Sequence, residues 1–512
     1  MPASWAAASA SSTSIAIDRS LGQGLTRQPL HDDERAAVVL ADVEHADRVG
    51  VREPGRRPRF RLEAGAEVGP RREVGEQRLD RDRSTESAVD AVAHLSHATA
   101  AEQLPAFVPA SDEVFSGLHG ADGLPDREGR LPCPAMVDPA FADVVDAFET
   151  NFAELGDVGA AVAVSVEGRL VVDLWGGVAD VATGRPWAED TTALVYSTTK
   201  GLTAIVALLA WERGNLDVDA PVASVWPEFA VAGKEAITGR QLMSHQAGLA
   251  AFTDPVTVAD LHPASAAAAR LATQSPAWEP GSAHGYHAIS YGWLVDELVF
   301  RATGRRVATT FADDVAGPLG LDAWIGLPPA QAHRVAALIE PRLSEPWVGG
   351  PPDHRVIALI EGLADPQSVT FRVFANPPMT TADFNSRETQ AAGWPATGGI
   401  ATARALAALY GELARNRVLS RETLDAASEP QVEGLDLTLR NRTSFGLGFA
   451  LPSDVITYGP NGGFGHDGAG GSIAFADRSA QLGFAYIPNQ MGNALGTDER
   501  ARRLIDAVYK AL

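Results

Sequence analysis

The chain has 512 residues, of which 45% are hydrophobic and 21% charged, a composition typical of a globular protein with a sizeable core. Its formal net charge of −23 disfavours binding to nucleic acid or to anionic membrane surfaces, and the C-terminal three-quarters of the chain contain no concentrated basic patch that would offset the repulsion. The single cysteine excludes an intramolecular disulfide framework and a cysteine-built zinc site. No apolar run is long enough to span a bilayer, and the N-terminus makes a poor secretion signal, so we predict a cytoplasmic protein.

Residues 1–130 differ in composition from the rest of the chain. They mix Arg, Glu, Gly and Pro and show almost no apolar periodicity. This composition favours a disordered extension over a folded regulatory domain. A wrongly assigned start, with Met136 as the true first residue, is an alternative that the sequence leaves open. We therefore place the compact domain at residues 138–512.

The compact domain begins with a helix and a hairpin. Apolar residues at helical spacing predict a helix over residues 141–152. Two β-branched runs, residues 160–166 and 169–174, flank Glu167–Gly168 and predict a β-hairpin.

The chain also ends with a hairpin and a helix. Residues 472–476 and 481–487 predict the hairpin, and residues 498–512 predict an amphipathic helix after it. The predicted helices between the two hairpins are residues 198–213, 264–273, 290–303 and 403–413. This order predicts an α/β (α+β) fold, in which an antiparallel sheet built from both ends of the domain is flanked by helices and carries an inserted, mainly helical subdomain.

The segment VYSTTKGLTAIVALLAWERGN places Ser197 at the start of an apolar helix, with Lys200 three residues later on the same helical face. A serine hydroxyl needs an adjacent base to become a nucleophile, and a buried lysine with a lowered pKa can serve as one. Only 3 of the 42 basic residues are lysines, so a lysine kept beside this serine indicates chemistry that arginine cannot supply. The alternative is a helix-capping serine followed by a solvated lysine.

Two later segments complete a pattern. WEPGSAHGYHAISYG carries Tyr286 in a short loop, and GFGHDGAGG carries His466 just before the closing hairpin. In this order the residues resemble the motifs of the serine β-lactamase and penicillin-binding protein superfamily, and more narrowly its class C β-lactamase-related branch, which includes the family VIII carboxylesterases. The segments LMSHQAGL and PATGGIATARALAALYG add to the resemblance, which extends from about residue 140 to the C-terminus.

The resemblance implies a role for each of these residues. Ser197 would be the nucleophile, and Lys200 would share the general-base task with Tyr286 as a phenolate. His466 would line the pocket and support Tyr286, in place of the lysine found in β-lactamases. The backbone N–H groups of Ser197 and of Ala469, which follows Gly468, would bind the oxyanion. No cofactor and no metal are predicted. A further histidine, His245, is expected to pack under the site as a hydrogen-bonded structural residue.

Two departures from the β-lactamase pattern favour an esterase. Ala288 stands where the family's asparagine contacts the antibiotic amide, and His466 replaces the lysine that binds its carboxylate. We therefore predict a carboxylesterase acting on a small-molecule ester through an acyl-Ser197 intermediate. A DD-peptidase or weak β-lactamase and an acyltransferase to a small alcohol or amine remain alternatives, and a non-catalytic binding protein is disfavoured. The sequence makes no prediction of oligomeric state.

Overall fold

The structure, a computed structural model, describes residues 136–341 and 354–512. The predicted extension, residues 1–130, lies outside the described residues. No helix in the described ranges is both long and apolar enough to cross a membrane. The cytoplasmic location stays a prediction.

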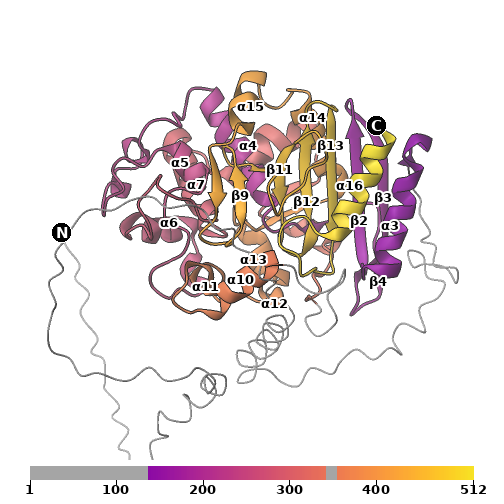
Figure 1. Cartoon of the computed structure of the whole chain (residues 1–512), viewed down its shortest axis with the longest axis horizontal. Helices are drawn as coiled ribbons and strands as arrows, with labels where there is room; N and C mark the ends of the chain where they lie inside the picture. Colours follow the sequence, from indigo (N-terminus) through magenta and orange to yellow (C-terminus); the bar gives the residue numbers. More distant parts are fainter. Residues whose placement is uncertain (1–135, 342–353) are drawn as a thin grey trace, which may run out of the picture. The chain divides into compact units, whose positions relative to one another are not determined.

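A ten-stranded antiparallel sheet forms the centre of the domain (Figure 1). Its strands are β1 (Met136–Val137), β2 (Gly159–Val166), β3 (Arg169–Asp180), β4 (Arg185–Pro186), β8 (Val432–Leu435), β9 (Arg442–Phe445), β10 (Ala450–Leu451), β11 (Phe464–Asp467), β12 (Ile473–Asp477) and β13 (Leu482–Pro488). Their order is β1-β3-β2-β13-β12-β11-β10-β9-β8, with β4 paired to β3. The predicted fold class is therefore confirmed.

The two predicted hairpins meet at the middle of this sheet. Strand β2 pairs with β13 in the register Val162 to Tyr486, which joins the two ends of the domain. Glu167 and Gly168 both adopt positive φ, 53° and 79°, as a tight hairpin turn requires. Strand β1 pairs with β3, so the sheet begins slightly before the predicted boundary at residue 138. Strand β1 has only two residues, too few for an alternation of apolar and polar side chains from which this pairing could be predicted.

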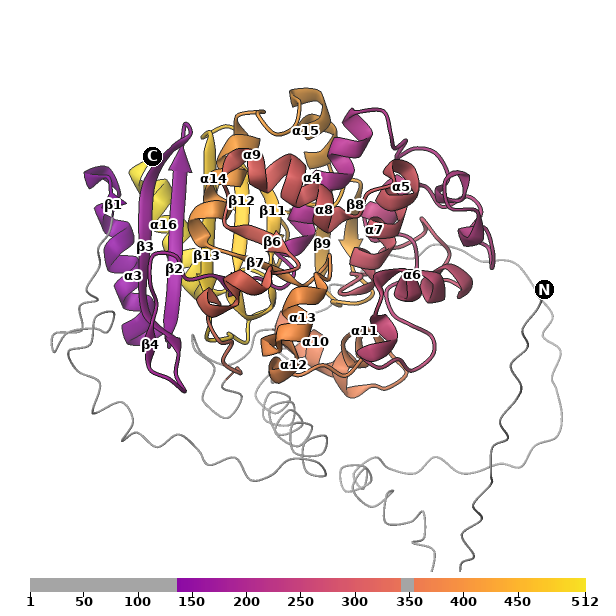
Figure 2. The ribbon, with the colours of Figure 1, turned by 180° about the vertical axis from the view of Figure 1, so that it is seen from behind.

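The sheet separates two apolar cores. Successive side chains of a strand point to opposite faces, so Val162 and Val164 lie in one core and Ala161 and Ala163 in the other. Helices α3 (Ala142–Glu154) and α16 (Glu499–Ala511) cover the first face, and α14 (Ala403–Ala414) and α4 (Thr199–Glu212) cover the second, as Figures 1 and 2 show from opposite sides.

The region inserted between β3 and β8 is mainly helical. Its core is α4, which is buried almost along its whole length and packs against α7 (Ser290–Thr303), whose bounds match the prediction. The other helices of the domain are α5 (Gly239–Met243), α6 (Ala264–Thr273), α8 (Val307–Phe311), α9 (Gly317–Leu319), α10 (His354–Ala364), α11 (Val369–Ala375), α12 (Thr381–Asn385), α13 (Arg387–Ala392) and α15 (Arg421–Ser428). A small sheet of β5 (Ala193–Leu194), β7 (Gly399–Ala401) and β6 (Ala323–Ile325) supports the start of α4.

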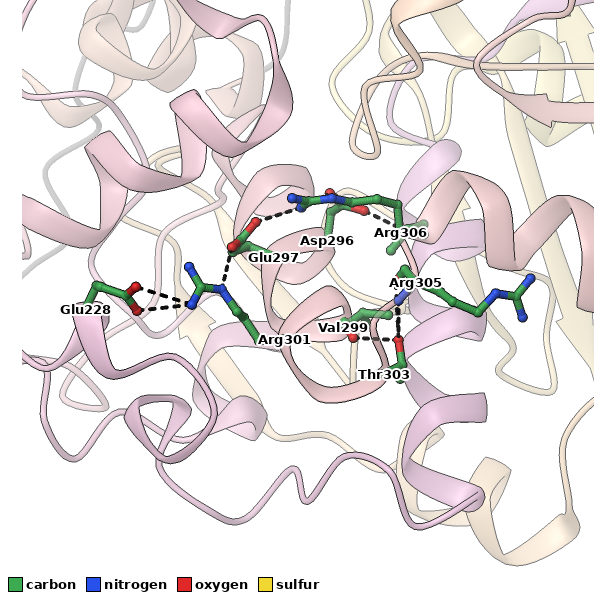
Figure 3. A network of polar contacts seen from close by, with 9 residues as sticks. Glu228, Asp296, Glu297, Val299, Arg301, Thr303, Arg305 and Arg306 are labelled. Atoms are coloured by element: carbon green, nitrogen blue, oxygen red, sulfur yellow. Dashed lines mark hydrogen bonds and ion pairs between the residues drawn. The ribbon is translucent and has the colours of Figure 1, made fainter. Parts of the chain in front are cut away.

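A polar network fixes the C-terminal part of α7 (Figure 3). The Arg306 guanidinium donates to Asp296 at 2.8 Å and to Glu297 at 2.7 Å. Glu297 also accepts from Arg301 at 2.7 Å, and Asp296 accepts from the Val307 N–H at 2.8 Å, where α8 begins. Because the carboxylates of Asp296 and Glu297 are almost fully buried, their pairing is needed to hold this end of α7 in place.

Candidate active site

Ser197 lies in the turn before α4 and not inside the helix, which begins at Thr199. Tyr196, just before it, adopts a positive φ of 42°, and the Lys200 N–H donates to the Ser197 carbonyl at 2.9 Å. The hydroxyl of Thr199 accepts from the Gly399 N–H at 2.8 Å, which ties the turn to β7. The turn therefore presents Ser197 at the helix N-terminus and keeps its hydroxyl within reach of Lys200.

The Lys200 amine faces three oxygen atoms. Its Nζ lies 3.0 Å from Ser197 Oγ, 2.6 Å from the Ala288 carbonyl oxygen and 3.2 Å from the Ala396 carbonyl oxygen. Lys200 is fully buried, and burial holds its pKa well below the usual value, against a smaller opposing effect of the Asp467 charge. A neutral amine has two N–H groups for the two carbonyls and one lone pair, which is then free to accept the Ser197 proton.

Tyr286 closes the site on the other side of the amine. The centre of its ring lies 4.7 Å from Lys200 Nζ, and the ring stacks on Phe445 at 6.0 Å. Burial raises the pKa of the Tyr286 phenol well above its usual value, and an interaction with the Ser197 side chain offsets only part of that effect. The buried site thus favours the neutral phenol over the phenolate that the family resemblance implied.

Asp436 holds the Tyr286 loop, and no sequence pattern points to this residue. Its fully buried carboxylate accepts a hydrogen bond from the Tyr286 N–H at 3.0 Å. The same oxygen also accepts from the N–H groups of Thr438 and Leu439, both at 2.8 Å. In the sequence Asp436 is an isolated aspartate between two leucines, and only the fold brings it to Tyr286.

Two histidines line the site in neutral form. His466 lies with its ring 5.9 Å from that of Tyr286, and its Nδ1 is 2.6 Å from the Asp467 carbonyl oxygen. Burial is the main cause that lowers the pKa of His466 to about 3, and the charge that Lys200 carries when it is protonated acts in the same direction. His245 accepts from the His287 N–H at 3.1 Å, and its ring packs 5.0 Å from that of Tyr286. The prediction of a hydrogen-bonded structural histidine at 245 is therefore confirmed.

The loop after β11 lies directly against the Ser197 turn. A Cβ at Gly468 would lie 2.3 Å from both the Ser472 hydroxyl and the Val195 carbonyl oxygen, so only glycine fits there. The Ser472 hydroxyl donates to that carbonyl at 2.8 Å and lies 3.2 Å from the Thr198 hydroxyl. The loop thus places Gly468, the residue before Ala469, against the residues on either side of Ser197 in the turn.

Two backbone donors of this region are free to bind an anion. Among the hydrogen bonds of the described residues, none uses the N–H group of Ser197 or that of Ala469. Both groups are the donors expected for an oxyanion. The structure thus brings Ser197, Lys200, Tyr286 and His466 together, and Gly468, which precedes Ala469, lies against the Ser197 turn.

Comparison with known proteins gives matches over most of the chain. The beta-lactamase family model matches residues 148–509. The esterase/beta-lactamase LipL of Mycobacterium tuberculosis is 36% identical over 378 residues, which cover 71% of this chain and 84% of that protein. A solved structure of a family VIII carboxylesterase matches with a TM-score of 0.66 and 38% identity, over 74% of this chain and 99% of that one. A penicillin-binding protein homologue from Caulobacter crescentus matches with the same identity, coverage and TM-score.

Proposed function

Because the chain belongs to the beta-lactamase family, we propose that it is a serine carboxylesterase that hydrolyses small-molecule esters through an acyl-Ser197 intermediate. The observation that carries this proposal is the buried Lys200 amine, 3.0 Å from Ser197 Oγ, with its two N–H groups satisfied by carbonyls. This arrangement supplies the base that a serine nucleophile needs. It requires no cofactor.

Acylation begins when Ser197 Oγ attacks the ester carbonyl carbon and its proton passes to the neutral Lys200 amine. The carbonyl oxygen becomes an oxyanion, which the N–H groups of Ser197 and Ala469 bind. When the tetrahedral intermediate collapses, the Tyr286 phenol gives its proton to the leaving alkoxide and regains one from the Lys200 ammonium. The products of this step are a free alcohol and the acyl-enzyme.

Deacylation repeats the sequence with water as the nucleophile. The Lys200 amine takes a proton from the water, directly or through Tyr286, as the water oxygen attacks the acyl carbonyl carbon. Collapse of the second tetrahedral intermediate breaks the bond to Ser197 Oγ, which takes a proton from the Lys200 ammonium. The carboxylic acid is released, and the site returns to its starting state. Transfer to an alcohol or amine would differ only in the attacking group.

Fluorophosphonate labelling tests the proposed nucleophile directly. Such a probe phosphonylates an activated serine with loss of fluoride, so the intact protein gains the mass of one phosphonyl group. We expect peptide mapping to place the adduct on Ser197, and we expect prior incubation with an ester substrate to slow the labelling. Ester turnover combined with an adduct on another serine would contradict the assignment.

Esters should be much better substrates than β-lactams. Ala288 lacks an amide to contact the antibiotic side chain, and neutral His466 cannot replace the lysine charge that binds its carboxylate. Each lost contact costs about 1–3 kcal/mol. Together they lower kcat/KM by roughly 30-fold to more than 10,000-fold. We expect ready turnover of short-chain p-nitrophenyl esters and slow or undetectable hydrolysis of nitrocefin, and nitrocefin turnover equal to that of the best ester would favour the β-lactamase alternative.

The charge of Asp467 should shift the acid limb of the pH–rate profile, which follows the titration of Lys200. Burial raises the pKa of Asp467 to about 6, and its charged form raises the pKa of Lys200. Removing that charge in Asp467→Asn leaves the desolvation of Lys200 less opposed, so the pKa of Lys200 falls. Because activity needs the neutral amine and is lost as pH falls through its pKa, the acid limb of kcat/KM should move to lower pH. An unchanged or upward-shifted limb would show that Lys200 is not the titrating base.

A further inference from the structure

A buried arginine lies behind the loop that carries Ala469. Arg500, in the first turn of α16, is only 4% exposed. All five of its N–H groups have acceptors. Asp498 Oδ2 accepts from Nε at 3.0 Å and from Nη2 at 2.6 Å, and Nη2 also donates to the Gly470 carbonyl at 2.7 Å. Nη1 donates to Asp157 Oδ1 at 2.8 Å and to the Gln490 carbonyl at 2.9 Å. No other side chain offers five donors in one rigid plane.

The carboxylates fix the orientation of this guanidinium. Asp157 and Asp498 are themselves buried, and the Tyr486 hydroxyl donates to the second oxygen of Asp157 at 2.5 Å. A buried charge is stable only when it is paired and hydrogen-bonded, so the cluster holds one geometry. The two carboxylates already neutralise the charge of the Arg500 guanidinium. The bonds from Arg500 to the Gln490 and Gly470 carbonyls are therefore not needed for charge pairing.

Those carbonyls belong to the two loops beside the nucleophile. The Gly470 carbonyl follows Ala469 directly, and it also accepts from the Gly492 N–H at 3.0 Å. The Gln490 carbonyl precedes Met491, whose sulfur lies 3.5 Å from the hydroxyl of Tyr196. Tyr196 is the residue before Ser197. One guanidinium therefore fixes the loop that carries one oxyanion donor and a loop that contacts the turn carrying the other.

Gly471 lies where the loop backbone comes close to the side chains of Asp498 and Arg500. Gly471 has a φ of 110°, and a Cβ there would lie 2.3 Å from an oxygen of Asp498 and 2.6 Å from Arg500 Nη2. The loop therefore lies directly on the ion cluster, with no side chain between them. A shift of the guanidinium would move the loop backbone, and a displacement of about 1 Å at a catalytic group can cost about a hundredfold in rate.

We propose that Arg500 is a positioning residue for the oxyanion hole, holding the Gly470 carbonyl so that the Ala469 N–H stays directed at the oxyanion. The inference rests on the proposed esterase function. It gives α16 a role in catalysis through the bond from Arg500 to the Gly470 carbonyl.

The test compares Arg500→Lys with Tyr486→Phe. Lysine keeps the charge but offers three donors in place of five, so it cannot hold both carboxylates and both loops. We expect kcat for a p-nitrophenyl ester to fall about ten- to a hundredfold with KM changed less than about threefold, the pattern of a weakened oxyanion contact. Affinity for a trifluoromethyl ketone, which forms an oxyanion on Ser197, should fall by the same factor. Tyr486→Phe loosens the same cluster without a bond to either loop, so it should lower Tm and leave kcat within about threefold.

Equal effects of the two variants on kcat, or an unchanged kcat in Arg500→Lys, would overturn the inference and leave Arg500 a structural residue. If Arg500→Lys fails to fold, Gly471→Ala disturbs the same contact from the loop side and should give the same loss of kcat and of ketone affinity. A failure of the proposed function is distinguishable, because the wild-type protein itself would then neither turn over esters nor bind the ketone.

Discussion

Replacing Ser197 by alanine is expected to lower kcat for ester hydrolysis by several orders of magnitude, up to roughly a millionfold, the scale seen when a serine hydrolase loses its nucleophile. Without Oγ no acyl-enzyme can form, and any remaining rate reflects water held near the oxyanion donors. The described contacts of the Ser197 side chain are those with Lys200 and Tyr286. The fold should therefore persist, with little change in Tm and no fluorophosphonate adduct.

A second serine supplies the control for this experiment. Ser165 on β2 is also buried, but it lies outside the candidate site. Ser165→Ala should keep both turnover and labelling. Retention of more than a few per cent of wild-type turnover in Ser197→Ala, measured on protein free of wild-type contamination, would show that another group carries the reaction.

The parts of the fold that were predictable are those in which a long pattern repeats. Residues 290–303 place apolar side chains along one helical face, and the structure has α7 with the same bounds. The strands β5, β6 and β7 contain two or three residues each, too few for any periodicity to appear. Helices α10 to α13 were also not predicted, and α12 and α13 are single short turns.

The parts of the site that were predictable are those in which spacing along the chain carries the chemistry. Ser197 and Lys200 are three residues apart, so their contact is nearly local. Asp436 and Arg500 act through backbone groups far away in the sequence, and no local pattern indicates such a contact. One feature of the sequence around Arg500 is unusual: this charged residue precedes Ala501 on the buried side of α16.

The scarcity of lysine in this sequence draws attention to Lys200, but scarcity alone does not identify a lysine as a general base. Lys234 is also fully buried, and its amine donates to the carbonyls of Val231 at 2.8 Å and Gln274 at 2.6 Å. Each of the two amines thus donates to two carbonyls of its own, and what distinguishes Lys200 is the serine hydroxyl at 3.0 Å. Lys234 is therefore the natural comparison for any substitution of Lys200.

Replacing Lys200 by arginine is expected to lower kcat at least about a hundredfold, the usual scale for loss of a general base. A guanidinium keeps the positive charge but stays protonated at every accessible pH, so it has no lone pair for the Ser197 proton. Lys200→Met, which keeps most of the volume without the charge, should lose activity to a similar extent. Burst-phase kinetics with a p-nitrophenyl ester would show that acylation itself is slowed.

The pH dependence separates a base from an electrostatic role. In the wild-type protein burial holds the pKa of Lys200 well below its usual value, so the amine is neutral above that lowered pKa and activity is lost as pH falls through it. In Lys200→Arg this limb should disappear, because no group at that position titrates. Lys234→Arg places the same substitution at a buried lysine that faces no hydroxyl, and it should lower Tm while leaving the profile unchanged. Near wild-type turnover in Lys200→Arg would mean that only the charge at this position matters, and the proton of Ser197 would then need another acceptor.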